Sequence, residues 1–148
     1  MYASEKAKEA ISVLSRTADK AKALTILRSS VKENPPSSFL LKMNFKVGAE
    51  KMASAIAESV APRHNNAKDV EELKTLIFNG VSAKGAATKG TTFQFDCDPN
   101  AICVSVDGKK QGEVHSSGLS KAFNDVYLDD KCVSGPLRDS CIQNCCLP

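Results

Sequence analysis

Two spacings of apolar residues alternate along the chain, and they separate helices from strands. Apolar positions that recur every three or four residues lie on one face of a helix, whereas alternation at every second residue is typical of a strand with one buried face. The helical spacing predicts six helices, which follow Ser4, follow Thr17, cover Gly48–Val60, run from Asn66 to Gly80, follow Ser117 and follow Ser134.

Several of these helices begin or end at residues suited to the position. The run Asn34-Pro35-Pro36 should end the second helix, because proline lacks the N–H that a helix interior needs. Asn66 and Ser134 can cap the helices that follow them, and Pro136 fits a first helical turn. Gly80 is expected to end its helix in a left-handed conformation.

The period of two occurs in four segments. It predicts a first strand over Ser38–Lys46, in which Phe39, Leu41, Met43 and Phe45 point to the same side. Three further strands are expected around Phe93–Cys97, Ile102–Val106 and Gly112–His115. Asp107-Gly108 between the last two predicts a hairpin turn in which both central residues have positive φ.

The order of these elements is helix pair, strand, helix pair, three-stranded meander and helix pair. Strands joined by hairpins pair antiparallel, so the pattern predicts an α+β fold with helices packed mainly on one face of an antiparallel sheet. No repeat, low-complexity tract or linker divides the 148 residues, which predicts a single domain over 1–148.

Charge and composition exclude some classes of function. The chain has 20 Lys and Arg against 17 Asp and Glu, a net charge of +3, no Trp and two Tyr, and its basic residues are interspersed with acids. This is not the one-sided basic face of a nucleic-acid-binding protein. No apolar run is long enough to span a membrane, and the charged first thirty residues lack a targeting segment.

Cysteine and histidine give no pattern of a metal site, and we expect neither a metal nor another cofactor. The six cysteines follow the helix and strand patterns and are interpreted as reduced core residues. His64 and His115 have no Cys or acid at metal-ligand spacing, and Cys141, Cys145 and Cys146 lack the usual C-x2-C spacing. The ending Cys145-Cys146-Leu147-Pro148 has the form of a prenylation box, but proline is unusual at its last position.

From Thr91 onward, three runs of sequence resemble the chalcone isomerase superfamily. These runs are T-F-Q-F-D, I-C-V-S-V-D-G-K-K-Q-G-E-V and L-S-K-A-F-N-D-V-Y-L-D-D-K-C-V-S-G-P-L-R. Upstream, F-K-V-G-A-E-K-M-A-S-A-I-A-E-S-V-A-P-R resembles the strand-to-helix segment of that family, and Met1-Tyr2-Ala3 resembles the strand end that enters its first helix. The resemblance implies a chalcone-isomerase-like fold that lacks the N-terminal strands of the family.

The same resemblance identifies positions at which isomerases carry catalytic side chains. The arginine that handles the substrate oxyanion, or a fatty-acid carboxylate in binding relatives, would lie before Met1 and matches no residue here. The tyrosine, asparagine and Ser/Thr positions fall on Lys51, Glu58 and Val126. Lys51 and Glu58 also fit a solvated helix face, and Val126 fits a core stripe.

We therefore expect a non-catalytic relative of the fatty-acid-binding branch, which holds a fatty acid or a similar small apolar ligand, such as a flavonoid-like molecule, between the sheet and the helices. The residues expected to contact the ligand are Phe39, Leu41, Met43, Lys51, Glu58, Phe123 and Val126. Two alternatives remain: an isomerase (intramolecular lyase) that closes the ring of a chalcone, and a protein that assists a partner enzyme. The second would use an open sheet edge, through which homo- or hetero-oligomers could form. Members of this family occur in plastids or in the cytoplasm, and the sequence does not decide between these two compartments.

Overall fold

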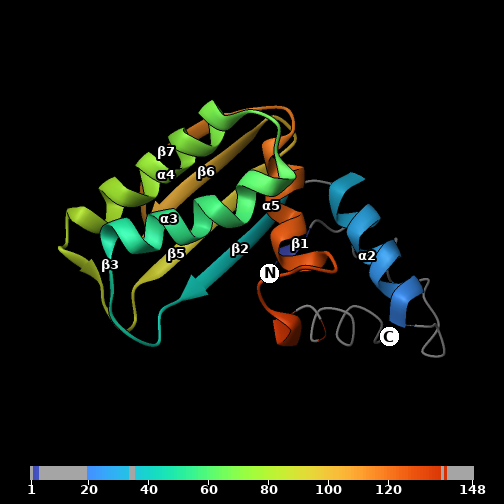
Figure 1. Cartoon of the computed structure of the whole chain (residues 1–148), viewed down its shortest axis with the longest axis horizontal. Helices are drawn as coiled ribbons and strands as arrows, with labels where there is room; N and C mark the ends of the chain where they lie inside the picture. Colours follow the sequence, from blue (N-terminus) through green and yellow to red (C-terminus); the bar gives the residue numbers. More distant parts are fainter. Residues whose placement is uncertain (1, 4–19, 34–35, 138, 140–148) are drawn as a thin grey trace.

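The computed structural model describes residues 2–3, 20–33, 36–137 and 139 (Figure 1). Within them, five strands form one antiparallel sheet in the order β1-β2-β5-β6-β7. The strands are β1 (Tyr2–Ala3), β2 (Ser37–Lys42), β5 (Thr92–Asp98), β6 (Ala101–Val106) and β7 (Lys109–His115). A separate two-stranded ladder joins β3 (Val47–Gly48) to β4 (Ala86–Ala87).

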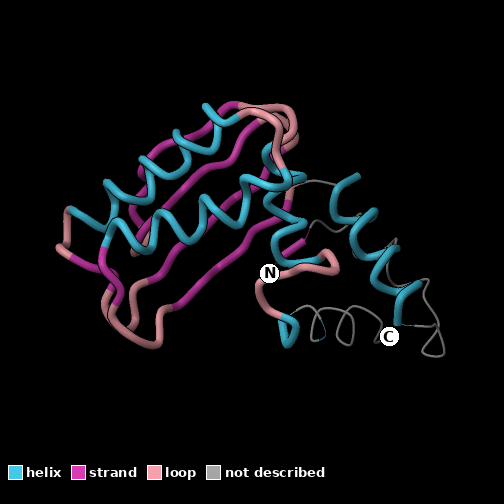
Figure 2. Tube along the Cα trace, in the orientation of Figure 1, coloured by secondary structure: helices cyan, strands magenta, loops and turns pink. Residues whose placement is uncertain are grey.

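The helices of this part of the chain pack in two places. They are α2 (Lys20–Glu33), α3 (Ala49–Val60), α4 (Ala67–Ser82) and α5 (Leu119–Leu128), with a short 3₁₀ turn η1 (Ala61–Arg63) between α3 and α4. Helices α3 and α4 lie side by side over one face of the sheet, whereas α5 packs at its end and α2 packs against α5 (Figures 1 and 2). The predicted α+β class, an antiparallel sheet with helices on one face, is confirmed.

The meander follows the predicted alternation closely. Phe93, Phe95 and Cys97 are buried toward the helices, whereas Gln94 between them is exposed on the other face. The turn after β6 has φ of 51° at Asp107 and 79° at Gly108, as the Asp-Gly pair predicts. Strand β7 begins directly after this turn, three residues earlier than the predicted third strand.

The first strand is shorter than predicted. β2 ends at Lys42, and the backbone N–H of Met43 then donates to the carbonyl of Thr91, while its own carbonyl accepts from Gly90. These bonds turn the chain toward β3, so Phe45 is not on the core face with Phe39; it is 67% exposed. The strand prediction is wrong for residues 43–46, because alternation alone does not show where backbone pairing stops.

Gly80 does not end its helix. It lies inside α4, and a Cβ atom at this position would come 2.6 Å from Cγ2 of Val106 on β6. The glycine therefore permits close packing of helix on sheet, and the left-handed residue is Gly85, with φ of 90°. The predicted cap Asn66 is confirmed, since its side chain accepts from the backbone N–H of Lys68.

Of the other helix ends that the sequence predicts, one is confirmed, one is shifted and the rest lie outside the described residues. Ser134 accepts from the backbone N–H of Leu137 and caps the turn that follows it. Helix α5 has Gly118 and not Ser117 as its N-cap. The helix predicted after Ser4 and the continuation of the last helix through Cys141 and Cys145 lie outside the described residues.

The predicted open edge of the sheet can be compared with the side of β2 that faces away from β5. β1 pairs with Ser37 and Ser38, and within the described ranges no further strand pairs with Phe39–Lys42 on that side. Oligomerisation through this edge stays a prediction, as does the single domain over 1–148.

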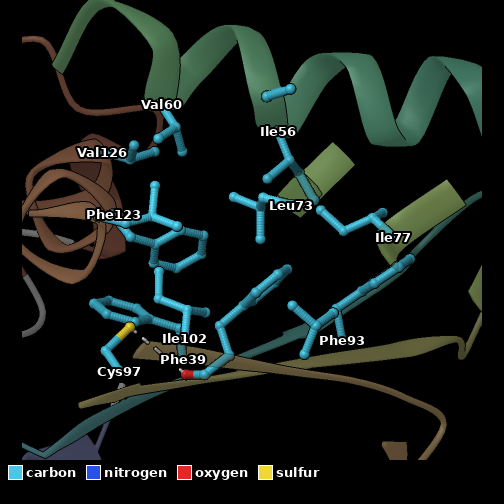
Figure 3. Packing of buried hydrophobic residues seen from close by; sticks show 14 of the residues in the cluster. Phe39, Ile56, Val60, Leu73, Ile77, Phe93, Cys97, Ile102, Phe123 and Val126 are labelled. Atoms are coloured by element: carbon cyan, nitrogen blue, oxygen red, sulfur yellow. Dashed lines mark hydrogen bonds between the residues drawn. The ribbon is translucent and has the colours of Figure 1, made fainter. Parts of the chain in front are cut away.

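One hydrophobic cluster joins the sheet to α3, α4 and α5 (Figure 3). Ile56 of α3 and Leu73 and Ile77 of α4 point toward the sheet on the side of Phe93, whereas Val60 of α3 points toward Phe123 and Val126 of α5. The largest side chains that are fully buried are Phe39, Phe93, Phe95, Phe123, Leu27, Leu73, Ile77, Ile102, Leu119, Leu128 and Val31. Leu27 and Val31 of α2 are buried four residues apart, as expected for one apolar face of the helix predicted after Thr17.

We predict that the effect of removing a phenyl ring depends on this burial. Phe95→Ala should lower the free energy of unfolding by about 3–5 kcal/mol, because it leaves a cavity in the core. Phe45→Ala, the same change at an exposed position, should stay within about 0.5 kcal/mol of the wild type. Urea unfolding followed by circular dichroism measures both, and equal losses would contradict the described core.

Candidate functional site

A hollow of about 390 Å³ lies beside the core, between the end of β2, helix α3, helix α5 and residues 133–137. Its walls are mostly aliphatic or aromatic. The lining residues are Leu41, Lys42, Met43, Ala55, Ile56, Ser59, Phe123, Val126, Tyr127, Val133, Ser134 and Leu137. We call this feature the apolar hollow. Its volume lies within the range of small-molecule sites.

Stacked aromatic rings form one side of the apolar hollow. Tyr127 stacks on Phe39 with ring centroids 4.8 Å apart, and Phe123 meets the edge of Phe39 at 5.5 Å. Phe95 lies 4.6 Å from Phe123 on the other side. Because these rings support one another, the wall that Phe123 and Tyr127 present is fixed by the core.

The structure brings together four of the seven residues expected to contact a ligand. Leu41, Met43, Phe123 and Val126 line the apolar hollow. Phe39 is 1% exposed and lies beneath the lining, in contact with Phe123 and Tyr127.

The two charged members of the predicted set lie elsewhere. Lys51 and Glu58 are exposed on α3, and neither lines the apolar hollow. Both positions therefore fit the solvated face that the sequence offered as their alternative. Their assignment to a ligand stays a prediction.

The polar rim of the apolar hollow contains a lysine that the sequence analysis did not single out. Lys42 is exposed, lines the hollow and forms no ion pair within the part of the chain that the structure describes. The hydroxyl of Ser59 donates to the carbonyl of Ala55, and that of Ser134 caps the turn at Leu137. Lys42 falls on the polar side of the alternation in β2, so periodicity alone predicts a surface residue and gives no sign of the hollow.

Tyr127 is a second residue whose part in the lining was not predicted. Burial raises the pKa of its phenol above the usual value, so the hydroxyl stays protonated. A protonated phenol beside an apolar wall can donate one hydrogen bond to an oxygen atom of a ligand. The apolar spacing after Ser117 is consistent with the burial of Tyr127 on α5, but it gives no sign that this residue lines a hollow.

An ion pair holds the segment 129–133, which follows α5 and closes one end of the apolar hollow at Val133. We call this segment the corner. Nε and Nη2 of Arg63 donate to the two carboxylate oxygens of Asp129, at 2.7 and 3.0 Å. The same guanidinium donates to the backbone carbonyls of Ser59 and Lys131. Arg63 thus ties the end of α3 to the segment after α5, where Val133 also donates its N–H to the carbonyl of Val126.

The two adjacent aspartates of the corner, Asp129 and Asp130, have different surroundings. The hydrogen bonds from Arg63 lower the pKa of the Asp129 carboxyl, whereas the neighbouring Asp130 is exposed. From the sequence alone, two consecutive aspartates at a helix end are best interpreted as a solvated corner, and this interpretation is wrong for Asp129. Its partner lies 66 residues away in the sequence, so local spacing could not reveal the pair.

A second polar cluster lies between η1 and the β7–α5 loop. Nε2 of His64 is 2.7 Å from Oδ2 of Asp69 and 3.5 Å from the hydroxyl of Ser116. Hydrogen bonds from Ser116 and His64 lower the pKa of Asp69. Because aspartate and serine meet the same ring nitrogen, the cluster lacks the arrangement of a hydrolase triad, in which they occupy opposite nitrogens.

The described cysteines and acids show no other reactive grouping. Cys97, Cys103 and Cys132 are free thiols, and burial raises the pKa of Cys97 to about 12, which keeps it protonated at neutral pH. Across the described ranges, no three His, Cys, Asp or Glu side chains come close enough together to hold a metal ion.

Residues 1–141 match the family model described as chalcone isomerase-like. The chain belongs to the chalcone isomerase-like family. The resemblance expected from the sequence motifs is thereby confirmed, and it covers almost the whole chain. No match was found among the curated proteins.

A solved structure supports the fold independently. The crystal structure of an Arabidopsis thaliana fatty-acid binding protein superposes with a TM-score of 0.69 at 17% sequence identity. The match covers 95% of this chain and 73% of that chain. At this identity it shows a shared fold. No described helix is long and apolar enough to cross a lipid bilayer.

We predict that the Arg63–Asp129 pair stabilises the corner in a pH-dependent way. Asp129→Asn should lower the free energy of unfolding at neutral pH by about 1–2 kcal/mol, since it weakens a partly buried, charge-assisted pair. The folded state lowers the pKa of Asp129, so its contribution is full above the unfolded value of about 4 and is lost as the pH falls below it.

Urea unfolding at several pH values measures this difference. The gap between wild type and Asp129→Asn should narrow as the pH is lowered below about 4. Asp130→Asn is the matched control, because the same change at an exposed neighbour should leave stability nearly unchanged. A gap that is equally wide in acid would refute the assignment.

Proposed function

We propose that this chain is a non-catalytic member of the family that binds a fatty acid or a similar apolar ligand in the apolar hollow. The observation that carries this proposal is the lining, in which nine of the twelve residues are aliphatic or aromatic. Covering such a wall with an alkyl chain contributes about 0.8 kcal/mol for each methylene removed from water. A long acyl chain therefore has a clear driving force.

Lys42 is the residue we propose for the carboxylate of the ligand. Its ammonium group lies on the rim and has no acidic partner among the described residues, so it is available to an anion. Lys51, which the family resemblance placed among the residues that contact the ligand, does not line the hollow. The fatty-acid binding of the Arabidopsis structure agrees with a ligand of this class but belongs to that protein.

Chalcone isomerase activity has less support from the same surface. The positions that the family resemblance assigns to catalysis carry an ammonium group, a carboxylate and an isopropyl group, at Lys51, Glu58 and Val126. Of these, Val126 alone lines the apolar hollow, and it has no proton to give. A binding role needs the apolar wall and does not need those groups.

Filling the apolar hollow should abolish binding. Ala55 is exposed at the rim, so Ala55→Trp can place an indole over the cavity without disturbing the core. We expect this variant to weaken binding of a fluorescent long-chain fatty acid at least about tenfold, as ligand and indole compete for one volume. Ala67→Trp, on the exposed start of α4, should bind like the wild type. Equal binding by all three proteins would refute the assigned site.

The role of Lys42 is tested by changing the ligand head group. Lys42→Gln should weaken binding of a fatty acid about two- to fivefold, the usual effect of one exposed ion pair. Its affinity for the alcohol of the same chain length should not change, because the alcohol carries no charge. Lys46→Gln provides the control, since Lys46 is also exposed but does not line the hollow. A similar loss for acid and alcohol would show that Lys42 does not contact the carboxylate.

A further inference from the structure

Two loops meet at the end of the sheet where β2 stops and β5 begins. The first covers residues 42–46 and the second covers residues 88–91; we call them together the basic tip. They are joined by hydrogen bonds from Met43 N–H to the Thr91 carbonyl at 2.9 Å and from Gly90 N–H to the Met43 carbonyl at 2.8 Å. Both can be followed at the lower left of Figures 1 and 2, below the β3–β4 ladder.

The basic tip exposes a phenyl ring. Phe45 is 67% exposed, more than any other large hydrophobic residue described, against 37% for Phe78 on α4. A single exposed apolar residue is common on protein surfaces and needs no special cause. What distinguishes Phe45 is the basic character of the two loops that meet at this tip.

Both loops carry lysines. Lys42 and Lys46 flank Phe45 in the sequence, Lys89 lies in the second loop, next to the Gly90 that bonds to Met43, and all three are exposed. None of them forms an ion pair within the described ranges. The sequence has no Asp or Glu between residues 34 and 49, or between 73 and 95.

Two acids in elements next to these loops are already paired. Glu50, at the start of α3, accepts from Lys74 at 2.9 Å. Asp107, in the β6–β7 turn, accepts from Lys84 at 2.5 Å. The whole chain carries a net charge of only +3, so three unpaired lysines around one loop pair are a local concentration of positive charge.

We propose that the basic tip docks on an anionic lipid bilayer. Phe45 enters the interface between head groups and acyl chains, and the three lysines lie against the negative head groups. An exposed aromatic residue supplies buried apolar area, while lysines near the surface add electrostatic attraction to acidic lipids. A nucleic acid fits the surface less well, because one aromatic ring gives a single stacking platform.

The position of the basic tip links docking to the apolar hollow. Lys42 and Met43 belong to both, so a docked tip brings the rim of the hollow to the membrane surface. An apolar ligand could then pass between bilayer and hollow with little exposure to water. This link rests on the proposed function, whereas docking itself does not.

The absence of Trp from the sequence allows a direct test. Phe45→Trp introduces a single tryptophan whose emission should shift to shorter wavelength when the tip enters a bilayer. We expect the shift with vesicles of phosphatidylcholine and phosphatidylserine, much less with phosphatidylcholine alone, and reversal at high salt. Phe78→Trp is the matched control, and its emission should not respond.

Co-sedimentation with the same vesicles measures affinity. Lys42→Gln combined with Lys46→Gln should lower binding about tenfold or more, as each lysine contributes roughly a factor of five. Phe45→Ser should lower it severalfold. Lys68→Gln combined with Lys121→Gln removes the same charge from exposed positions on α4 and α5, away from the two loops, and should change binding little.

Several results would overturn the proposal. They are the absence of vesicle binding by the wild type, equal losses from the tip and control variants, and equal affinity for neutral and anionic vesicles. Tighter binding to an acidic protein or to a nucleic acid than to the vesicles would also overturn the choice of lipid. Ala55→Trp separates this proposal from the function proposed above, because it should lose fatty-acid binding and keep vesicle binding.

Discussion

The packing of α5 on the sheet through aromatic rings is the contact on which the rest of the molecule depends. Phe39 from β2 and Phe95 from β5 meet Phe123 and Tyr127 from α5, with ring centroids between 4.6 and 5.5 Å apart. This contact fixes how far α5 stands from β2. The apolar hollow is the space that remains beside it, so its shape follows from core packing.

One consequence is that several residues of the proposed site also belong to the hydrophobic core. Phe123, Val126 and Tyr127 are nearly buried and belong to the core, yet they also form a wall of the apolar hollow. A surface made in this way can hold an apolar chain, because the only requirement is a dry, shaped wall. Chemistry would need polar groups aimed at a reacting atom, and the wall that α5 presents offers the phenol of Tyr127 as its single ionisable group.

The sequence predicted the parts that depend on local repetition. The buried faces of β5 and β6, the Asp107-Gly108 turn and the cap at Asn66 follow from spacing and turn chemistry, and family motifs supplied the topology. The failures share another cause. Where β2 stops is decided by the pairing of Met43 with a loop almost fifty residues away, and Gly80 is explained by its contact with Val106.

The same limit applies to the candidate site. The alternation of Leu41 and Met43 and the stripe of Phe123 and Val126 identified apolar lining residues, because burial repeats with the element that carries it. Lys42 and Tyr127 were missed as lining residues, since their surroundings come from other segments. Lys51 and Glu58 were included through a family motif and not through any property of their own spacing.

The reach of Arg63 has a consequence for the order in which the molecule is assembled. Its partners Asp129 and Lys131 lie 66 and 68 residues further along the chain. During synthesis, Arg63 can donate to the nearby Ser59 carbonyl, but its bonds to Asp129 and Lys131 cannot form until those residues have left the ribosome, after α4 and the whole meander. Closing so long a loop is slow compared with local pairing. We therefore expect the corner to form late in folding, and the end of the apolar hollow beside Val133 to take its shape only then.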